Sequence, residues 1–300
     1  RKFREDPYSI IDLINLGTFS EEMAAYLWMS LENSASIMVL GGTASGKTTA
    51  LNALACLIKP GSKIITIEET AELNLPHENW VSLIARQSYG LGGSSVGEVA
   101  LFDLVKTSMR HRPDVLIVGE VRGQEAYVLF QALATGHGGM CTMHADSLDS
   151  AVKRLTQKPM DISPAYIPLM NLILSVQRVH LTVDGEKKTY RRILNVNEIA
   201  DYEDYRCTFK WHPTKDEHLQ SFDHSIMLPF ISERVGTSKR DLLEELERRG
   251  EVLKWMRERD IRSYKDVAAI IAEYYARPDQ IYEKVVAGEE VKALAIAGKS

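Results

Sequence analysis

Short apolar runs separated by helical patterns dominate the first two thirds of this 300-residue chain. The runs occupy positions 36–40, 63–67, 80–85, 115–118, 138–143 and 172–176, and most of them are rich in Ile, Val and Leu. A continuous apolar run of this length is typical of a strand that is buried on both faces. Between the runs, residues 50–57 and 124–135 show the apolar spacing of helices that cover a sheet. The pattern therefore predicts an open α/β sheet.

Two further patterns follow the α/β part. Residues 179–199 alternate around Asp184-Gly185, which is a hairpin turn signal, and Arg191 and Arg192 lie on the second strand of this hairpin. From Ser238 onward, apolar residues recur at helical spacing through three successive segments. We therefore divide the chain into a linker with two helices at 1–35, an α/β core at 36–235 and an all-helical module at 236–300.

A glycine-rich loop joins the first apolar run to the helical pattern after it. Gly41 and Gly46 bracket four residues and Lys47-Thr48 follow, which is the G-x-x-x-x-G-K-[ST] phosphate loop. Such a loop cradles a polyphosphate with backbone amides, while its lysine reaches the β- and γ-phosphates and its hydroxyl residue ligates Mg²⁺. The sequence thus predicts a nucleoside triphosphate site formed by Gly41, Gly42, Thr43, Ala44, Ser45, Gly46, Lys47, Thr48 and Thr49, with Thr48 on the metal.

Two acids and a histidine follow predicted strands, and they are Glu68, Glu120 and His144. Ligands of open α/β sheets bind at the carboxyl ends of the strands. We expect Glu120 to act as general base or to orient the attacking water, because an acid that ends a buried run needs a partner. A solvated acidic loop remains the alternative for Glu68, and a structural role remains the alternative for His144.

Arginines close the helix that is predicted up to about residue 111. Arg110 and Arg112 could offset the negative end of that helix dipole, or they could donate to a triphosphate across a subunit boundary. The sequence leaves both interpretations open.

Composition narrows the class of protein. A net charge of −5 provides no overall positive field for nucleic acid. Three cysteines without a CxxC spacing suit a reducing cytosol and argue against zinc. We find no run of about 18 apolar residues, so we expect no membrane span. Because the chain begins at Arg1 without methionine, we expect a fragment of a longer protein.

Taken together, the motifs closely resemble those of the secretion ATPase superfamily, which serves type II and type IV secretion, type IV pilus assembly and the archaellum. The matching segments are Gly41 to Thr49, Ile67-Glu68-Glu69, Arg112-Pro113-Asp114, Gly119-Glu120-Val121-Arg122-Gly123 and Thr135 to His144. They are similar to that family's Walker A loop, Asp box, Walker B element and His box. The opening Lys2-Phe3-Arg4-Glu5-Asp6-Pro7 and the helical tail resemble the archaeal branch, especially the archaellum motor ATPase.

The resemblance implies a RecA-like P-loop NTPase core that hydrolyses ATP with Mg²⁺. It implies the catalytic glutamate at Glu120, the Asp-box carboxylate at Glu68, the His-box sensor at His144 and phosphate contacts from Lys47. Arg86, Arg110 and Arg112 become candidates for contacts to the nucleotide or to a neighbouring subunit. Two departures matter: a glutamate stands where many NTPases have aspartate, and we expect the family's N-terminal domain, which closes over the nucleotide, to be missing from this chain.

The resemblance further implies a homo-hexamer in the cytoplasm at the inner face of the cell membrane. ATP hydrolysis there would move subunits and act on a membrane-embedded platform protein. Three alternatives stay open: a nucleic-acid translocase on the same core, a kinase that uses the phosphate loop, and a nucleotide-gated assembly scaffold that hydrolyses little. The charge of −5 and the lack of a basic stripe with interleaved aromatic residues weigh against the translocase. For a kinase, no acceptor pocket is identifiable.

Overall fold

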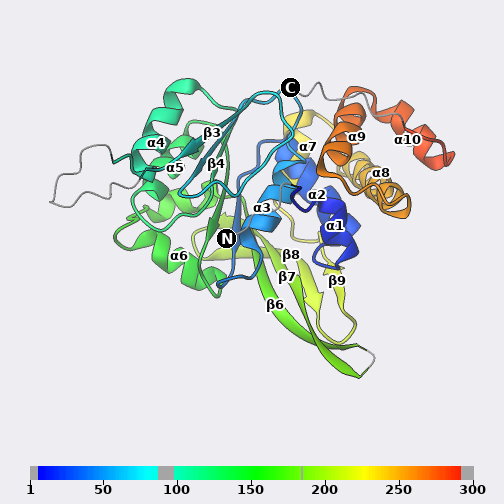
Figure 1. Cartoon of the computed structure of the whole chain (residues 1–300), viewed down its shortest axis with the longest axis horizontal. Coiled ribbons are helices and arrows are strands. Elements are labelled where there is room, and N and C mark those ends of the chain that lie inside the picture. The colour runs from blue at the N-terminus through cyan, green and yellow to red at the C-terminus, as the bar shows by residue number, and fades with distance from the viewer. Residues whose placement is uncertain (1–5, 87–97, 184, 292–300) are drawn as a thin grey trace.

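The structure is a computed structural model that describes residues 6–86, 98–183 and 185–291. Within these residues, nine strands form one sheet in the order β3-β2-β4-β5-β1-β6-β7-β8-β9 (Figure 1). The parallel part contains β3 (Trp80–Ile84), β2 (Ile64–Glu68), β4 (Val115–Val118), β5 (Gly138–Met143), β1 (Ile37–Leu40) and β6 (Leu172–Val183). The antiparallel part adds β7 (Glu186–Asp201), β8 (Asp204–His212) and β9 (Glu217–Gln220).

Helices cover both faces of the parallel part. Ile37 and Val39 of β1 belong to a core with α1 (Ile10–Asn15), α2 (Glu21–Glu32) and α3 (Lys47–Ala55). Met38 and Leu40, the alternate residues of the same strand, belong to a second core with α4 (Leu101–Ser108), α5 (Glu125–Ala134) and α6 (Leu148–Thr156). Successive side chains of a strand point to opposite faces, so the sheet separates two helical layers. This arrangement confirms the expected RecA-like α/β core.

The strand order brings the predicted site together. In the sheet, β5 lies between β1 and β4, and β2 lies on the other side of β4. All four strands are parallel, so the segments that follow them leave the sheet at one edge. Those segments carry the phosphate loop, Glu68, Glu120 and His144. The carboxyl ends of strands that are distant in the sequence therefore lie side by side, as they do in the ligand sites of open α/β sheets.

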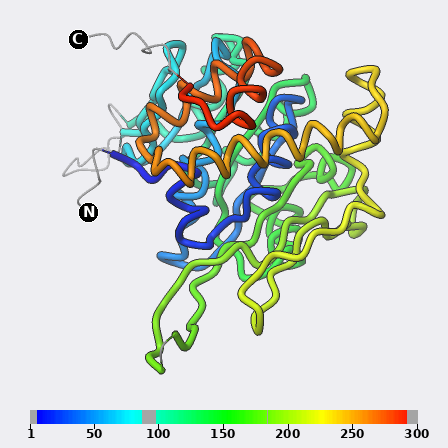
Figure 2. The backbone as a smooth tube through the Cα atoms, turned by 90° about the vertical axis from the view of Figure 1, so that its right-hand side faces the viewer, coloured from blue at the N-terminus to red at the C-terminus, as the bar shows by residue number. Residues whose placement is uncertain are grey.

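The C-terminal part is helical, as the sequence predicts. It contains α8 (Lys239–Glu258), α9 (Tyr264–Ala276) and α10 (Pro278–Val286), and α7 (Met227–Val235), which the sequence does not predict, comes just before it. Figure 2 shows α8, in orange and gold, running along one side of the molecule. Residues of all four helices share one hydrophobic core with α1, α2 and α3, and the rings of Trp28 and Tyr274 meet edge to face at 5.1 Å. The helical part thus packs into the same core as α1, α2 and α3. The domain boundary at residue 236 stays a prediction.

A buried carboxylate fastens α7 to the sheet. Glu198 of β7 is 0% exposed and accepts hydrogen bonds from the Tyr26 hydroxyl at 2.6 Å and the Ser225 hydroxyl at 2.7 Å. It also accepts from the backbone amides of Ile226 and Met227, which open α7. A carboxylate at a helix N-terminus satisfies amides that have no partner within the helix. Burial and the neighbouring Glu198 charge raise the pKa of Tyr26.

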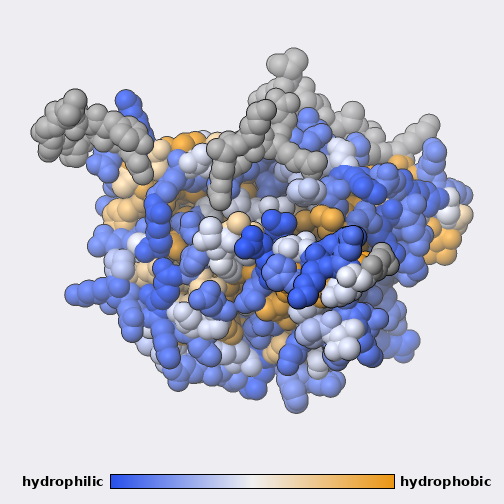
Figure 3. Space-filling model, turned by 60° about the horizontal axis from the view of Figure 1, so that its bottom comes forward, coloured by the Kyte–Doolittle hydropathy of each residue, from blue (hydrophilic) through white to orange (hydrophobic). Residues whose placement is uncertain are grey.

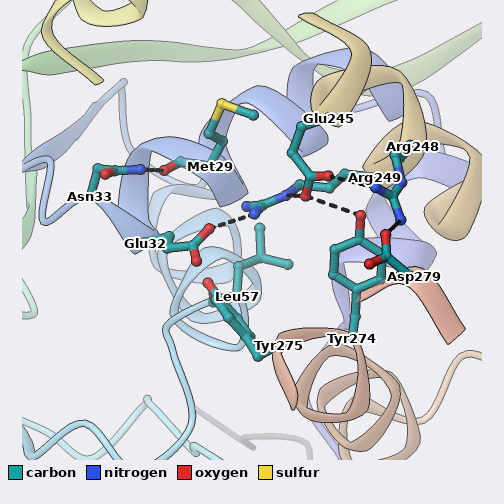
Figure 4. Close-up of polar contacts among 10 residues, drawn as sticks. All are labelled: Met29, Glu32, Asn33, Leu57, Glu245, Arg248, Arg249, Tyr274, Tyr275 and Asp279. Atoms are coloured by element: carbon teal, nitrogen blue, oxygen red, sulfur yellow. Dashed lines mark hydrogen bonds and ion pairs between the residues drawn. The ribbon is translucent and has the colours of Figure 1, made fainter. Parts of the chain in front are cut away.

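An arginine fastens α8 to α2 (Figure 4). Arg249 is 5% exposed, and its Nε donates to Glu245 at 2.8 Å while its Nη2 donates to Glu32 at 2.5 Å. The guanidinium also lies 4.9 Å from the centre of the Trp28 ring, and the Tyr274 hydroxyl donates to Glu245 at 3.0 Å. We call Arg249, Glu245, Glu32, Trp28 and Tyr274 the helical junction.

Three details differ from the predicted pattern. The run at 172–176 and the hairpin form one continuous strand pair, with a bulge between Ser175 and Val176. The short elements α7 and β9 are not evident in the sequence, because α7 contains Pro229 and leaves Phe230 half exposed. The irregular stretch before β6 contains a short 3₁₀ helix, Pro164–Leu169. The glycines and serines at 90–95 predict a flexible loop, which lies outside the described residues. Among the residues that the structure covers, no helix is long and apolar enough to cross a membrane.

Candidate nucleotide-binding site

Glycines shape the loop between β1 and α3. A Cβ atom at Gly41 would lie 2.3 Å from the Val176 carbonyl oxygen and 2.5 Å from Ser45 Oγ, so only glycine fits there. Gly46, immediately before α3, has φ of 100°, which favours glycine. The backbone therefore closes into a tight loop at a helix N-terminus, which is the geometry that binds an anion.

Polar groups of this loop open into a cleft of about 620 Å³ that Thr43, Ala44, Ser45, Gly46, Lys47, Thr48 and Thr49 line. Gly41 and Gly42 do not line it; Gly41 is buried beneath the loop. Lys47 Nζ donates to the Gly42 carbonyl at 3.0 Å, and the buried Ser45 Oγ has no protein partner among the described residues. A buried hydroxyl without a partner is rare, and here it marks a place for a ligand or water.

Glu68 ends β2 beside the loop and lines the same cleft. The side chain is 3% exposed, and its Oε1 accepts from the backbone amides of Glu72 and Leu73, both at 3.0 Å. Its buried Oε2 has no partner among the described residues. Burial raises the pKa of Glu68, although the two amides lower it. Glu68 is therefore a buried cleft carboxylate, and its position does not match a solvated acidic loop.

Glu120 and His144 follow β4 and β5, and both exposed side chains line the cleft. The Thr142 hydroxyl donates to the Gly119 carbonyl at 2.6 Å, and the Val121 amide donates to the Thr142 carbonyl at 2.9 Å. These bonds hold the end of β4 against β5. Gly119 also lets Glu68 approach, since a Cβ atom there would lie 3.1 Å from Glu68 Cγ.

His137 precedes β5 and lies at the other edge of the sheet. Its Nδ1 is 3.0 Å from the Thr135 hydroxyl and 3.1 Å from the Ala132 carbonyl oxygen. These contacts hold the end of α5, so His137 has a structural role here.

The structure does not bring the three predicted arginines into the cleft. Arg110 and Arg112 come just before β4, so they lie at the amino edge of the sheet, opposite the phosphate loop. Arg86 follows the edge strand β3, and its backbone pairs with Val99. These positions place Arg110 and Arg112 away from the cleft of their own chain.

Two other arginines line the cleft. Arg122 forms an ion pair with Glu69, and Arg191 of β7 lies beside the phosphate loop. A signal for Arg122 exists, because it stands in the segment Gly119-Glu120-Val121-Arg122-Gly123. Arg191 has no local signal, because 147 residues separate it from Ala44 of the loop.

The donors of the cleft fit a magnesium ion. Mg²⁺ binds oxygen atoms and usually retains several waters beside one or two protein ligands. The Thr48 hydroxyl and the carboxylates of Glu68 and Glu120 are oxygen donors that line one cleft. In the part of the chain that the structure describes, no group of three or more His, Cys, Asp or Glu could hold a metal by itself. The oxygen donors of the cleft therefore fit a Mg²⁺ ion that takes some of its ligands from a bound phosphate.

Comparison with known proteins identifies close relatives. Residues 1–208 match the family described as Type II/IV secretion system protein, and residues 216–297 match PilB3-like, C-terminal. The uncharacterized protein MJ0900 of Methanocaldococcus jannaschii is 38% identical over 286 residues, which are 92% of this chain and 50% of that protein. The uncharacterized protein MJ1287 of the same organism is 41% identical over 249 residues, or 81% of this chain and 89% of that protein.

A solved structure also matches part of the chain. The VirB11 ATPase from the Brucella suis type IV secretion system, in complex with sulphate, is 26% identical, with a TM-score of 0.45. The match covers 65% of this chain and 64% of that chain. The chain thus spans about half of MJ0900 and about two thirds of this solved chain, but most of MJ1287.

Proposed function

Because the chain belongs to the Type II/IV secretion system protein family, we propose that it binds ATP with Mg²⁺ in this cleft and hydrolyses it. One observation carries the proposal. The phosphate loop, Glu68, Glu120 and His144 come from four different parts of the sequence and line one cleft at the carboxyl edge of the sheet. Scaffold packing alone would not require two exposed polar side chains and a buried carboxylate with an unpaired oxygen beside a phosphate loop.

Each residue has a role in this proposal. The amides of the loop and Lys47 bind the β- and γ-phosphates, and Thr48 holds the metal. When bound, Mg²⁺ neutralises charge on the phosphate oxygens. Glu120 orients and deprotonates the attacking water, because it ends β4 with its carboxylate open to the cleft. Glu68 provides the second carboxylate of the cleft, in buried, low-dielectric surroundings. His144 donates a hydrogen bond to the terminal phosphate.

We further propose that the protein works as a homo-hexamer at the cytoplasmic face of the membrane, where it drives an archaeal pilus-like filament, an archaellum or a secretion machine. Two relatives from an archaeon support the archaeal part of this proposal. Arg110 and Arg112 lie at the edge opposite their own cleft, which is where donors to a neighbouring subunit can lie, and Arg86 is a further candidate. Contacts to the γ-phosphate would hold the subunits in one arrangement, and hydrolysis would release them. The resulting motion would be passed to the platform protein.

Phosphate release from ATP and Mg²⁺, measured per chain over a range of protein concentrations, tests the proposal. We expect the specific activity to rise with concentration, because a neighbour completes the site, and to fall at least about 100-fold in Glu120→Gln. Lys47→Ala should lose ATP binding. A specific activity that stays flat with concentration would contradict the ring, and Glu120→Gln at the wild-type rate would contradict the catalytic assignment.

A further inference from the structure

The outer part of the β6–β7 hairpin projects beyond the rest of the sheet. Strand β1 pairs with β6 only as far as Leu40 and Ser175, whereas β6 continues to Val183 against β7. We call residues 176–183 and 186–193 the ribbon. Figure 1 shows the ribbon extending away from the body, and Figure 3 shows hydrophilic side chains gathered around its end, which faces the viewer. The base of the ribbon adjoins the phosphate loop, because Val176 directly follows the residue that pairs with Leu40.

One face of the ribbon is basic. Alternate residues of paired strands share a face, and this face carries Arg178, His180, Lys187, Thr189 and Arg191. Arg178 and Arg191 are register partners, so they stand directly opposite each other. Like charges in directly opposite positions destabilise a strand pair unless something of the other sign lies between them. Among the described residues, neither arginine forms an ion pair, and Glu186 pairs instead with Lys188 at 3.6 Å.

Arg191 reaches the phosphate loop. Its Nη2 lies 3.5 Å from the Ala44 carbonyl oxygen, and its Cδ lies 2.9 Å from where a Cβ atom on residue 46 would stand. The aliphatic stem therefore covers Gly46, and the guanidinium lines the cleft. Gly46 serves two purposes: it adopts the left-handed conformation and it lets this side chain pass.

The other cations of the cleft have protein partners. Arg122 is paired with Glu69, and Lys47 donates to the Gly42 carbonyl. Among the described residues, the contact with Ala44 is the one hydrogen bond formed by the Arg191 guanidinium, which has five N–H donors. An arginine with open donors beside an anion-binding loop is suited to a phosphate.

We propose that Arg191 binds the polyphosphate of the nucleotide from within the same chain, and that Arg178 reinforces its charge. The base of the ribbon then becomes a wall of the nucleotide site, and the position of the ribbon depends on whether a polyphosphate is bound. This inference rests on the proposed function, since it takes the ligand of the cleft to be a nucleoside triphosphate.

Equilibrium binding of MgATP and MgADP to the full chain tests the inference. The variant Arg191→Gln keeps most of the stem over Gly46 and removes the charge, whereas Lys187→Gln removes a charge from the same face of the ribbon farther from the loop. We expect Arg191→Gln to weaken both affinities about tenfold or more, and Lys187→Gln to stay within about twofold. Arg191→Lys should recover part of the loss, and Arg191→Gln should reduce the salt dependence of binding. The melting temperature without nucleotide should not fall, because the substitution removes one of two directly opposed positive charges.

The outcomes separate this inference from the proposed function. If Lys47→Ala loses ATP binding while Arg191→Gln binds as the wild type does, the inference on Arg191 is wrong and the proposed function stands. If Lys47→Ala itself binds ATP like the wild type, the cleft is not the nucleotide site and both fail. Equal losses in Arg191→Gln and Lys187→Gln would also overturn the inference, because they would indicate the general field of the ribbon rather than a contact.

Discussion

Two clusters of charged side chains, the helical junction and the cleft, differ in what completes them. At the helical junction, Arg249 finds two carboxylates and an aromatic ring within the chain. In the cleft of about 620 Å³, one oxygen of Glu68 has no partner among the described residues, and the exposed side chains of Glu120 and Arg191 line its wall. The fold pairs the charges of the junction, although Arg249 Nη1 and Trp28 Nε1 have no hydrogen-bond partner among the described residues, whereas the charges of the cleft are arranged for a ligand.

The difference has an energetic reason. A buried charge without a partner is costly, so a fold retains it only where something else supplies the partner or where function demands it. Removing a charge should therefore destabilise the protein at the junction and leave it unchanged, or stabilise it, in the cleft. Activity should respond in the opposite way, and the substitutions below separate the two regions.

Arg249→Met should have the largest effect on stability. It leaves Glu32 without its ion pair, leaves Glu245 with only Tyr274 and the longer ion pair to Arg248, and removes the cation from the Trp28 ring. We therefore expect a loss of about 3–5 kcal/mol in the free energy of unfolding. Urea unfolding followed by circular dichroism measures it. The control is Arg240→Met, whose solvent-exposed pair with Glu244 should contribute little to stability. Equal losses in the two variants would show that the junction does not anchor α8.

Glu198→Gln should follow with a loss of about 2 kcal/mol. The carboxylate accepts from four donors, two of them α7 amides, and an amide group would place its own hydrogens against some of them. The exposed Glu217→Gln on β9 is the control. The same urea measurement decides: a Glu198→Gln variant as stable as this control would mean that packing alone holds α7 to the sheet.

The sequence predicts the cleft well because its signals are local. A glycine-rich loop, an acid after each of two apolar runs and a histidine after a third are each legible within ten residues. Parallel strands then bring these ends to one edge, so the fold class alone places Glu68, Glu120 and His144 around Lys47. The same reasoning predicts most of the strands and helices.

Contacts between distant segments leave no such signal. Arg191 lies 147 residues from the loop that it touches, and Arg249 lies 217 residues from Glu32. In the sequence, Arg249 is one charge of a helix rich in charges and reads as a solvated position. Only the tertiary packing makes it a buried anchor. Sequence analysis also misses short elements such as α7, because a nine-residue helix that contains a proline shows only a weak helical periodicity of apolar residues.

Glu68→Gln should have the smallest effect on stability, and its sign should be opposite. Burial raises the pKa of Glu68 in the folded chain above the value of the unfolded chain, so the native state takes up this proton more readily. Stability attributable to this group therefore falls as the pH rises from the unfolded pKa through the folded pKa, and ionised Glu68 destabilises the protein at neutral pH. Glutamine removes that cost and still offers an oxygen to the amides of Glu72 and Leu73. We expect a higher melting temperature without nucleotide at pH 7.5, and the gain should shrink as the pH falls toward about 4.

The matched control for this prediction is Glu120→Gln, because Glu120 lines the same cleft with an exposed carboxylate. Its melting temperature should stay near that of the wild type at every pH, since an exposed substitution usually changes stability by less than about 0.5 kcal/mol. Both variants should nevertheless lose phosphate release. If Glu68→Gln melts lower than the wild type at pH 7.5, the ionised carboxylate stabilises the fold, and Glu68 belongs with the helical junction rather than with the cleft. If it melts higher and turnover is lost, the protein keeps an unfavourable buried charge for its activity, which is the property that distinguishes the cleft from the junction.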